Sequence, residues 1–167
     1  MNVYLLRHAI AVLRGTEEYE RDSDRPLTPK GEKKMHRIAE GMKAMGLSFD
    51  VILSSPVLRA RQTAEIAAEV LGQKKRLEFL EALSTSGDPE DIVNAIQKKY
   101  TSCEDILLVG HEPDMSALIS VLLSGDDNLA ITMKKGGLCK LTIDEIQFGK
   151  CATLEWLLAP KQLIRLA

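Results

Sequence analysis

Three separate segments of the chain carry side chains suited to holding a small anion. Arg7 and His8 follow a short apolar run, His111 follows another, and Arg59 lies one turn into an amphipathic stretch. A guanidinium group presents a rigid fork of donors that matches phosphate oxygens. An imidazole can donate a hydrogen bond or attack as a nucleophile. Together these groups could bind a small dianion such as a phosphoryl group, provided that the fold brings them together.

The elements around these residues predict such a fold. Strand-length apolar runs alternate with amphipathic stretches, and three of the predicted helices begin at a capping residue followed by proline. This alternation predicts an α/β three-layer sandwich, with a mainly parallel central sheet, helices on both faces and a C-terminal hairpin. The predicted strands are residues 3–6, 50–54, 77–83, 105–109, 138–143 and 152–158, and the predicted helices start at Thr28-Pro29, Ser55-Pro56, Asp88-Pro89 and Met115.

The basic residues all lie at one kind of position in this arrangement. Arg7 and His8 follow the first predicted strand, Arg59 follows the second and His111 follows the fourth. The carboxyl ends of parallel strands share one edge of the sheet, where ligands bind in α/β proteins. The helices that start beside Arg59 and His111 also direct free N–H groups and positive dipole ends to that edge. The sequence therefore predicts an anion site there.

Composition limits the remaining possibilities. The 167 residues, of which 45% are hydrophobic and 28% charged, predict one globular domain over residues 1–167. The 22 basic and 24 acidic residues give a net charge of -2, so we expect no general affinity for nucleic acid or membrane. The first apolar run ends at Arg7, far short of a signal peptide, which predicts a cytoplasmic protein. Cys103, Cys139 and Cys151 predict buried thiols, because no Cys-x-x-Cys pair occurs.

The motifs resemble those of a known family. The run Tyr4-Leu5-Leu6-Arg7-His8-Ala9 is similar to the Arg-His-Gly signature of the histidine phosphatase superfamily, the relatives of cofactor-dependent phosphoglycerate mutase. Residues 53–64, LSSPVLRARQTA, resemble its second motif, and Val109-Gly110-His111-Glu112-Pro113 its third. The small chain and the run Asp24-Arg25-Pro26-Leu27-Thr28 resemble more narrowly the SixA-type phosphohistidine phosphatase branch. Three motifs in order at matching strand ends are a specific signal.

The resemblance implies a mechanism that suits these residues. His8, as a neutral imidazole, would attack phosphorus and form a phosphohistidine, which water then hydrolyses. Arg7, Arg59 and His111 would bind the phosphoryl oxygens and stabilise the transition state. Arg25 matches the extra arginine of the SixA pattern, so we expect it to contact phosphate or substrate. No metal ion and no other cofactor are implied, since cationic side chains neutralise the phosphoryl charge.

Two positions depart from the family pattern. Ala9 replaces the usual glycine, so this position must adopt an ordinary backbone conformation. Ala82 lies where the superfamily usually has the carboxylic acid that protonates an alkoxide leaving group. Glu81 and Glu112 are the nearest candidates for that acid. If neither serves, the missing acid favours a substrate with a good leaving group, such as phosphohistidine.

Several functions remain open at this stage. The preferred substrate is phosphohistidine in a signalling or phosphocarrier protein, for example a phosphotransfer domain. The alternative is a phosphomonoesterase for a small phosphorylated metabolite. A non-catalytic phosphate-binding module is less favoured, because binding requires cations but no nucleophile such as His8. Mutase activity ranks low, since no large insertion is present to shape a bisphosphate pocket. The charged segment 14–25 is interpreted as a surface loop that could border the site.

Overall fold

The centre of the structure is one six-stranded sheet with the strand order β3-β2-β4-β1-β5-β6. The computed structural model describes all residues, 1–167. The first four strands pair in parallel, whereas β5 and β6 are antiparallel, which confirms the predicted mixed sheet with a hairpin at one end. The strands are β1 Asn2–Arg7, β2 Val51–Ser54, β3 Leu77–Phe79, β4 Asp105–Gly110, β5 Leu138–Ile143 and β6 Ala152–Leu158.

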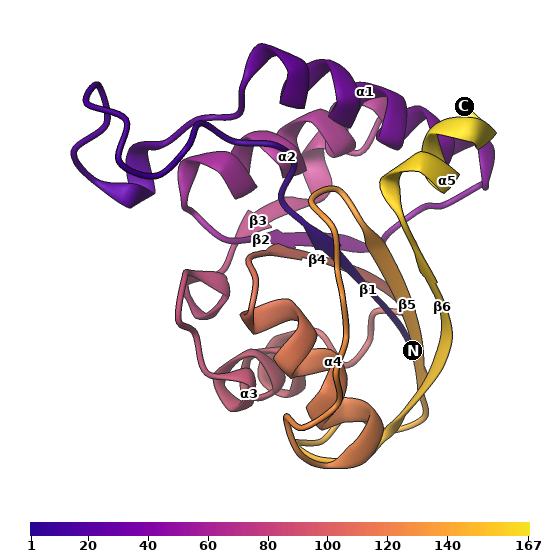
Figure 1. The fold of residues 1–167 in the computed structure, drawn as a ribbon. Coiled ribbons are helices and arrows are strands. Elements are labelled where there is room, and N and C mark those ends of the chain that lie inside the picture. Colours follow the sequence, from indigo (N-terminus) through magenta and orange to yellow (C-terminus); the bar gives the residue numbers. More distant parts are fainter.

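Helices cover both faces of this sheet (Figure 1). On one face lie α1 (Pro29–Ala44), α2 (Leu58–Val70) and the C-terminal α5 (Pro160–Leu166), and on the other lie α3 (Pro89–Lys99) and α4 (Asp114–Ser124). Each face buries its own apolar cluster against the sheet. Alternate residues of the parallel strands enter opposite clusters, as their near-continuous apolar sequences require. The three-layer prediction is confirmed, and α5 is an element that the sequence interpretation missed.

Of the four predicted helix starts, two are correct, the one at Met115 is a single residue late because α4 begins at Asp114, and one is wrong. The side chains of Thr28 and Asp88 accept backbone N–H bonds at the starts of α1 and α3. Ser55, in contrast, does not cap a helix that begins at Pro56, because α2 begins only at Leu58. The segment between β2 and α2 is therefore an extended corner. This corner leaves the Ser55 hydroxyl free for the contact with a histidine described below.

Other expectations need correction. The predicted strand at 77–83 ends at Phe79, and residues Glu81–Leu83 form a short 3-10 helix instead. Of the three cysteines only Cys139 is buried, while Cys103 and Cys151 are half-buried, and none forms a disulfide. Burial raises the pKa of the Cys139 thiol to about 12. None of the helices is long and apolar enough to span a membrane.

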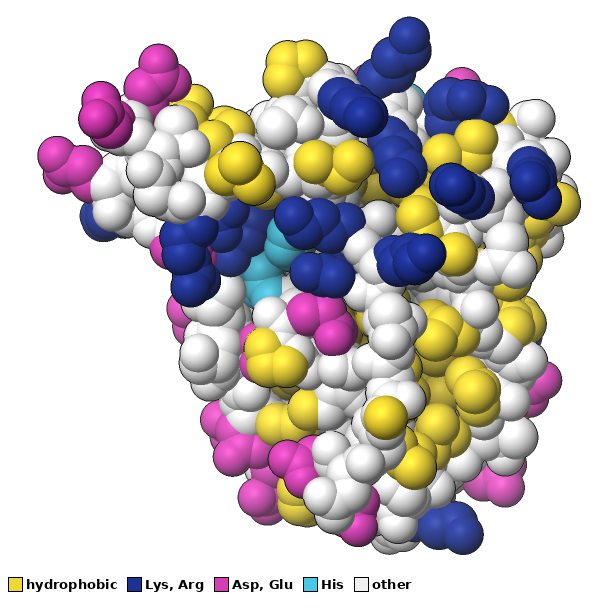
Figure 2. All heavy atoms as spheres, viewed as in Figure 1, with side chains coloured by type: hydrophobic (Ala, Val, Ile, Leu, Met, Phe, Trp, Pro, Cys, Tyr) yellow, Lys and Arg dark blue, Asp and Glu magenta, His cyan; other side chains and the backbone are white.

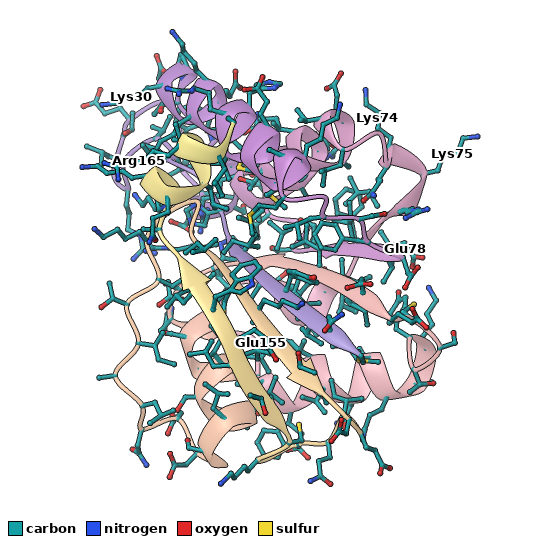
Figure 3. The ribbon with its side chains drawn as sticks, turned by 90° about the vertical axis from the view of Figure 1, so that its right-hand side faces the viewer. Lys30, Lys74, Lys75, Glu78, Glu155 and Arg165 are labelled. Atoms are coloured by element: carbon teal, nitrogen blue, oxygen red, sulfur yellow. The ribbon has the colours of Figure 1, made fainter.

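The two edge strands carry charged side chains, which Figure 3 shows from the side of the hairpin. Glu155 lies on the exposed surface of β6. Glu78 on β3 accepts hydrogen bonds from Lys99 (2.7 Å) and Tyr100 (2.7 Å). Charges on edge strands disfavour pairing with a second chain. The sheet is therefore protected at both edges.

Helix α5 is held close to α1 by a glycine. A Cβ atom at Gly41 would collide with the backbone carbonyl of Leu163, and a carbonyl in a helix backbone cannot move aside. We predict that Gly41→Ala lowers the free energy of unfolding by about 1–3 kcal/mol, as overpacking of a tight contact does. Thermal unfolding measures this effect, with the exposed neighbour Glu40→Ala as control. Equal melting temperatures for Gly41→Ala and wild type would contradict the close packing of α5.

Candidate active site

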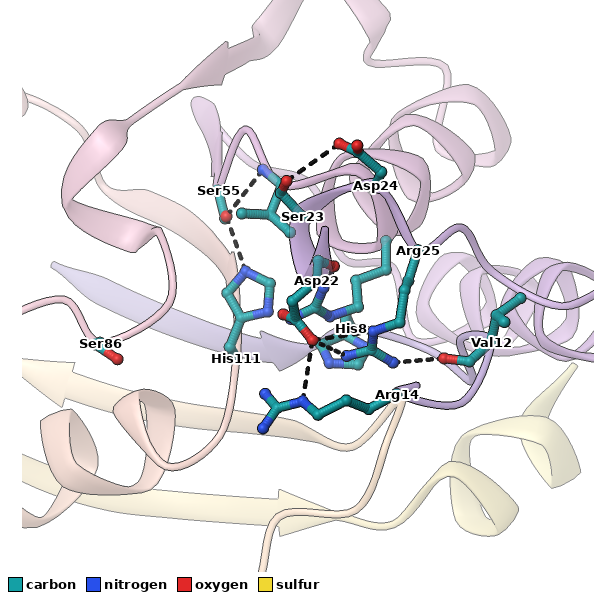
Figure 4. A network of polar contacts seen from close by, with 12 residues as sticks. His8, Val12, Arg14, Asp22, Ser23, Asp24, Arg25, Ser55, Ser86 and His111 are labelled. Atoms are coloured by element: carbon teal, nitrogen blue, oxygen red, sulfur yellow. Dashed lines mark hydrogen bonds and ion pairs between the residues drawn. The ribbon is translucent and has the colours of Figure 1, made fainter. Parts of the chain in front are cut away.

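The carboxyl ends of three parallel strands bring the predicted residues together (Figure 4). In the β1–β4 register Arg7 is paired with Gly110, and the His8 N–H donates to the Gly110 carbonyl (3.0 Å). The Ser55 N–H, after β2, donates to the Val109 carbonyl (2.9 Å). As a result, the His8 and His111 rings lie 5.3 Å apart, centroid to centroid. The predicted convergence at one sheet edge is confirmed.

His8 is placed as a neutral imidazole. The residue is only 6% exposed, and its Nδ1 lies 2.7 Å from the carbonyl oxygen of Ala9. Because a carbonyl only accepts, Nδ1 carries the proton and the lone pair of Nε2 is available for attack. Burial lowers the pKa of His8 to about 3, and the neighbouring His111, Arg59 and Arg7 act in the same direction. His8 therefore has the tautomer and charge of a nucleophile.

His111 is placed as a hydrogen-bond donor. Its Nε2 lies 2.8 Å from the Ser55 hydroxyl, which itself accepts the Val57 N–H (3.2 Å). In the tautomer in which this hydroxyl donates to Nε2, the His111 ring carries its proton on Nδ1. This Nδ1 is buried and has no hydrogen-bond partner. Burial, followed by the charge of Arg59, lowers the pKa of His111 to about 4, so the ring is neutral.

Two arginines add further donors without partners. Arg7 donates from Nη1 to the Met133 carbonyl (2.8 Å), but its buried Nε has no acceptor, and neither has the buried Nε of Arg59. Burial lowers the pKa of both guanidinium groups, partly offset by Glu112 near Arg7 and Asp22 near Arg59. Buried donors that lack an acceptor are rare and costly. Together with Nδ1 of His111, these residues supply three buried donors that lack an acceptor.

Asp22 is the site residue that the sequence interpretation missed. Its carboxylate accepts from Nη2 of Arg59 (2.9 Å), from Nε and Nη2 of Arg25 (3.0 and 2.7 Å) and from Nε of Arg14 (3.2 Å). Burial by itself would raise the pKa of Asp22, but the hydrogen bonds and charges of Arg25 and Arg59 hold it at about 2. Arg25 is thus at the site, as predicted, but its partners are Asp22 and the Val12 carbonyl.

The two candidate acids lie at the rim and contact neither histidine. Glu81 is exposed and accepts from the Ser84 hydroxyl (2.9 Å). Glu112 is half-buried, and Ser116 donates to it from both N (3.0 Å) and Oγ (2.7 Å). Each carboxylate accepts hydrogen bonds from a neighbouring serine, and the role of either as the proton donor stays a prediction.

The departure at Ala9 is accommodated without strain. The residue is buried, and Ser86 is the only non-glycine residue with positive φ, so Ala9 adopts the predicted ordinary backbone conformation. Its N–H donates to Thr63 Oγ1 (3.1 Å), and that hydroxyl donates to the Arg59 carbonyl (2.7 Å). Thr63 therefore ties the segment that carries His8 to the helix that carries Arg59.

Lys135 is a further cation that the sequence interpretation missed. The segment around it surrounds Arg7: the Gly136 N–H donates to the Arg7 carbonyl (3.0 Å), and the Arg7 N–H donates to Gly137 (3.2 Å). Gly136 has φ +78, and a Cβ there would lie 2.6 Å from Ile38. Burial, then Arg7, Arg25 and Arg59, lowers the pKa of Lys135. The Lys-Lys-Gly-Gly run before β5 was the available signal.

The charges gather on one face of the molecule. Figure 2 shows histidine side chains in a hollow bordered by Lys and Arg side chains. Acidic side chains occupy the tip of the loop of residues 13–24, which projects from the body of the molecule. Overall charge is nearly balanced, so the positive potential is local. No group of three or more His, Cys, Asp or Glu side chains is spaced to hold a metal ion. The hollow is thus suited to a small anion held by side-chain donors.

The buried histidines predict how stability depends on pH. Both have folded-state pKa values, about 3 and about 4, below the unfolded value near 6.5, so the unfolded state binds more protons in that range. Stability is therefore full above about pH 6.5 and decreases as the pH falls toward 4. We expect the melting temperature to decrease over this range, and less steeply in the double variant His8→Asn/His111→Asn. An unchanged slope in that variant would contradict the neutral state of the two rings.

Comparisons with known proteins agree with this site. The family model of the histidine phosphatase superfamily (branch 1) matches residues 3–84. An uncharacterized protein of Picosynechococcus sp. is 37% identical over 144 residues, covering 84% of each chain. The phosphohistidine phosphatase SixA of Escherichia coli K12 is 29% identical over 165 residues, 98% of this chain and 96% of the relative. The structure of the protein histidine phosphatase SixA complexed with tungstate has a TM-score of 0.83 at 27% identity, covering 98% of this chain and 99% of that one.

The fold and the similarities together identify a phosphatase whose sheet edge gathers arginine and histidine side chains. The chain belongs to the histidine phosphatase superfamily. Within that superfamily, its similarity over the whole length is to the SixA-type branch. The resemblance noted from the three motifs is thereby confirmed.

Proposed function

We propose that the protein hydrolyses phosphohistidine in a protein partner, such as a phosphotransfer domain or a phosphocarrier, through a phosphohistidine formed on His8. The observation that supports this most directly is the pairing of a neutral His8 with three buried donors that lack acceptors. A phosphoryl group has three oxygens and could satisfy the Nε atoms of Arg7 and Arg59 and Nδ1 of His111. The names of the SixA relatives support the substrate class.

The first step transfers the phosphoryl group to the enzyme. The lone pair on Nε2 of His8 attacks phosphorus, and the bond from phosphorus to the substrate imidazole breaks. A proton from solvent on the far nitrogen of the substrate ring lets the imidazole leave as a neutral molecule. This leaving group therefore requires no carboxylic acid from the enzyme, which agrees with Ala82 and with the engaged positions of Glu81 and Glu112.

The second step releases phosphate. The Nδ1 proton of His8, held by the Ala9 carbonyl, stays on the ring throughout, so the phosphorylated ring is cationic. Water attacks phosphorus, the bond to Nε2 breaks, His8 returns to its neutral state, and the water protons remain on phosphate and in solvent. Arg7, Arg59 and His111 stabilise the charge on the equatorial oxygens in both steps. The scheme uses no metal ion or cofactor.

The test compares two substrates. Phosphate release is measured, without added metal, from a phosphohistidine-bearing carrier protein and from an aliphatic phosphomonoester. Release from the phosphohistidine alone is expected. Faster release from the ester would favour the metabolite phosphomonoesterase and imply that Glu81 or Glu112 acts as an acid. No release from either would favour a phosphate-binding module. The single domain over residues 1–167 and the cytoplasmic location stay predictions from the sequence.

A carboxylic acid introduced at position 82 should shift the substrate preference toward phosphomonoesters. Ala82 is half-buried in the short helix at the rim, where the family pattern has its acid. We predict that Ala82→Glu raises phosphomonoester turnover by about tenfold, a fraction of what a well-placed general acid supplies. Ala82→Gln, which gives a side chain of the same size as glutamate but without an acidic proton, is the matched control. Equal ester turnover in the two variants would refute the missing-acid argument.

A further inference from the structure

The arginines that should hold a phosphoryl group already hold a carboxylate of the same chain. Nη1 of Arg59 donates to the Asp22 carbonyl (2.8 Å), and Nη2 donates to its Oδ2 (2.9 Å). Arg25 directs Nε and Nη2 to Oδ1 of Asp22, while its Nη1 donates to the Val12 carbonyl. Only Nε of Arg59 is left without a partner. A ligand that approaches Arg59 end-on, through both Nη1 and Nη2 as Asp22 does, would take the place of Asp22.

The same contact between Asp22 and Arg59 fixes a loop to the rest of the protein. Residues 13–24 project from the body of the molecule (Figure 1), and their base is closed by the Ala11–Leu27 bridge and the bond from Val12 N to the Pro26 carbonyl (2.9 Å). The other hydrogen bonds and ion pairs of the segment lie within it or join it to its base. Its hydrogen bonds to the remaining protein are the two between Asp22 and Arg59.

We propose that Asp22 is an internal competitor for the phosphoryl group, displaced from Arg59 when substrate binds, with release of the loop. This inference rests on the proposed function, since it assumes that the phosphoryl group binds at Arg59. The carboxylate presents two anionic oxygens to the arginines, as a phosphoryl group would. The competition sets how tightly the site binds a phosphoryl group, and it leaves segment 13–24 free to move only while substrate is bound.

The burial of the arginines determines whether removing the Asp22 carboxylate strengthens or weakens anion binding. The side chains of Arg59 and Arg25 are only 4% and 12% exposed, whereas that of Asp22 is 33% exposed. Without Asp22 the two buried charges lack a counterion, which destabilises the empty protein. A bound anion restores the counterion, so it should bind a variant without the carboxylate more tightly. If Asp22 instead only held the arginines in position, removing it would weaken binding.

The experiment measures binding of tungstate, a tetrahedral dianion, by isothermal titration calorimetry. Asp22→Asn keeps the size of the side chain and removes its charge. We expect its Kd for tungstate to be about tenfold lower than that of wild type, within the usual range of coupling between two ligands. Asp24→Asn is the matched control, because Asp24 lies in the same turn and pairs only with Arg21 and Ser23. Its Kd should equal that of wild type.

A second readout uses the wild-type protein, so that it does not depend on how well Asp22→Asn folds. Hydrogen exchange of the amides in residues 13–24 should become faster when tungstate is added. An unchanged or higher Kd in Asp22→Asn, or slower or unchanged exchange in wild type, would overturn the displacement. Those outcomes leave the proposed function intact if wild type binds tungstate and hydrolyses phosphohistidine. Absence of tungstate binding in both proteins would overturn both proposals.

Discussion

Replacing His8 with alanine should lower kcat for phosphohistidine hydrolysis by about 10⁴-fold or more, the loss typical of removing a catalytic nucleophile. So large a loss is expected because every phosphoryl group passes through Nε2 of this ring. The imidazole is buried, neutral and fixed by the Ala9 carbonyl, whereas Nε2 of the other buried histidine, His111, is engaged by the Ser55 hydroxyl. Phosphate release from a phosphohistidine-bearing protein measures the loss.

The chain contains its own control for this variant. His36 lies on the exposed side of α1, and His36→Ala should hydrolyse phosphohistidine with the kcat of wild type. His8→Ala should still bind tungstate, because the arginine donors remain. Substantial turnover by a folded His8→Ala protein would show that water attacks the substrate directly and would contradict the covalent mechanism.

Replacing Arg59 with alanine should lower kcat/KM by about 10²–10³-fold, the range for removing one preorganised donor from a charged transition state. Arg59 is almost fully buried near both histidines. It is the only arginine of α2 that donates hydrogen bonds to Asp22 in the loop of residues 13–24. Arg59→Lys should recover little of this activity, since an ammonium group lacks the planar fork of donors. Steady-state kinetics with the phosphohistidine substrate provide the measurement.

Arg61 is the matched control for Arg59. It lies two residues further along the same helix, is half exposed and pairs with Glu65 (2.8 Å). Arg61→Ala should therefore leave kcat/KM within about twofold of wild type, as surface ion pairs contribute little. Equal losses in the two variants would mean that general positive charge, rather than the placement of Arg59, determines activity.

The sequence predicted those parts of the site that strand ends position. Arg7, His8 and His111 each follow a parallel strand, and parallel strands end at one edge, so their meeting follows from topology alone. Arg59 could be added because a helix was predicted to follow the second strand, although that helix begins at Leu58 and not at Pro56. The conformation of Ala9 was also predictable, since an alanine rarely adopts the positive φ that a glycine tolerates.

The parts that were missed depend on contacts distant in sequence. Asp22 lies in a charged segment without periodicity, and nothing local distinguishes it from Glu20 or Asp24. Ser55 followed by proline fits a helix cap, but its hydroxyl is bound by His111, 56 residues away. Lys135 approaches the site only because its neighbours hydrogen-bond to Arg7. Such contacts join segments that lie far apart in the sequence, so no local pattern encodes them.

The most direct test of the central claim is to trap the phosphorylated enzyme. The wild-type protein is mixed with a radiolabelled phosphohistidine carrier, quenched within one turnover in alkali, which preserves phosphohistidine, and digested for mass spectrometry. The account predicts a phosphoryl group on the peptide that contains His8, on the ring of that residue. A phosphoryl group on His111, or turnover with no phosphorylated enzyme at any time, would contradict it.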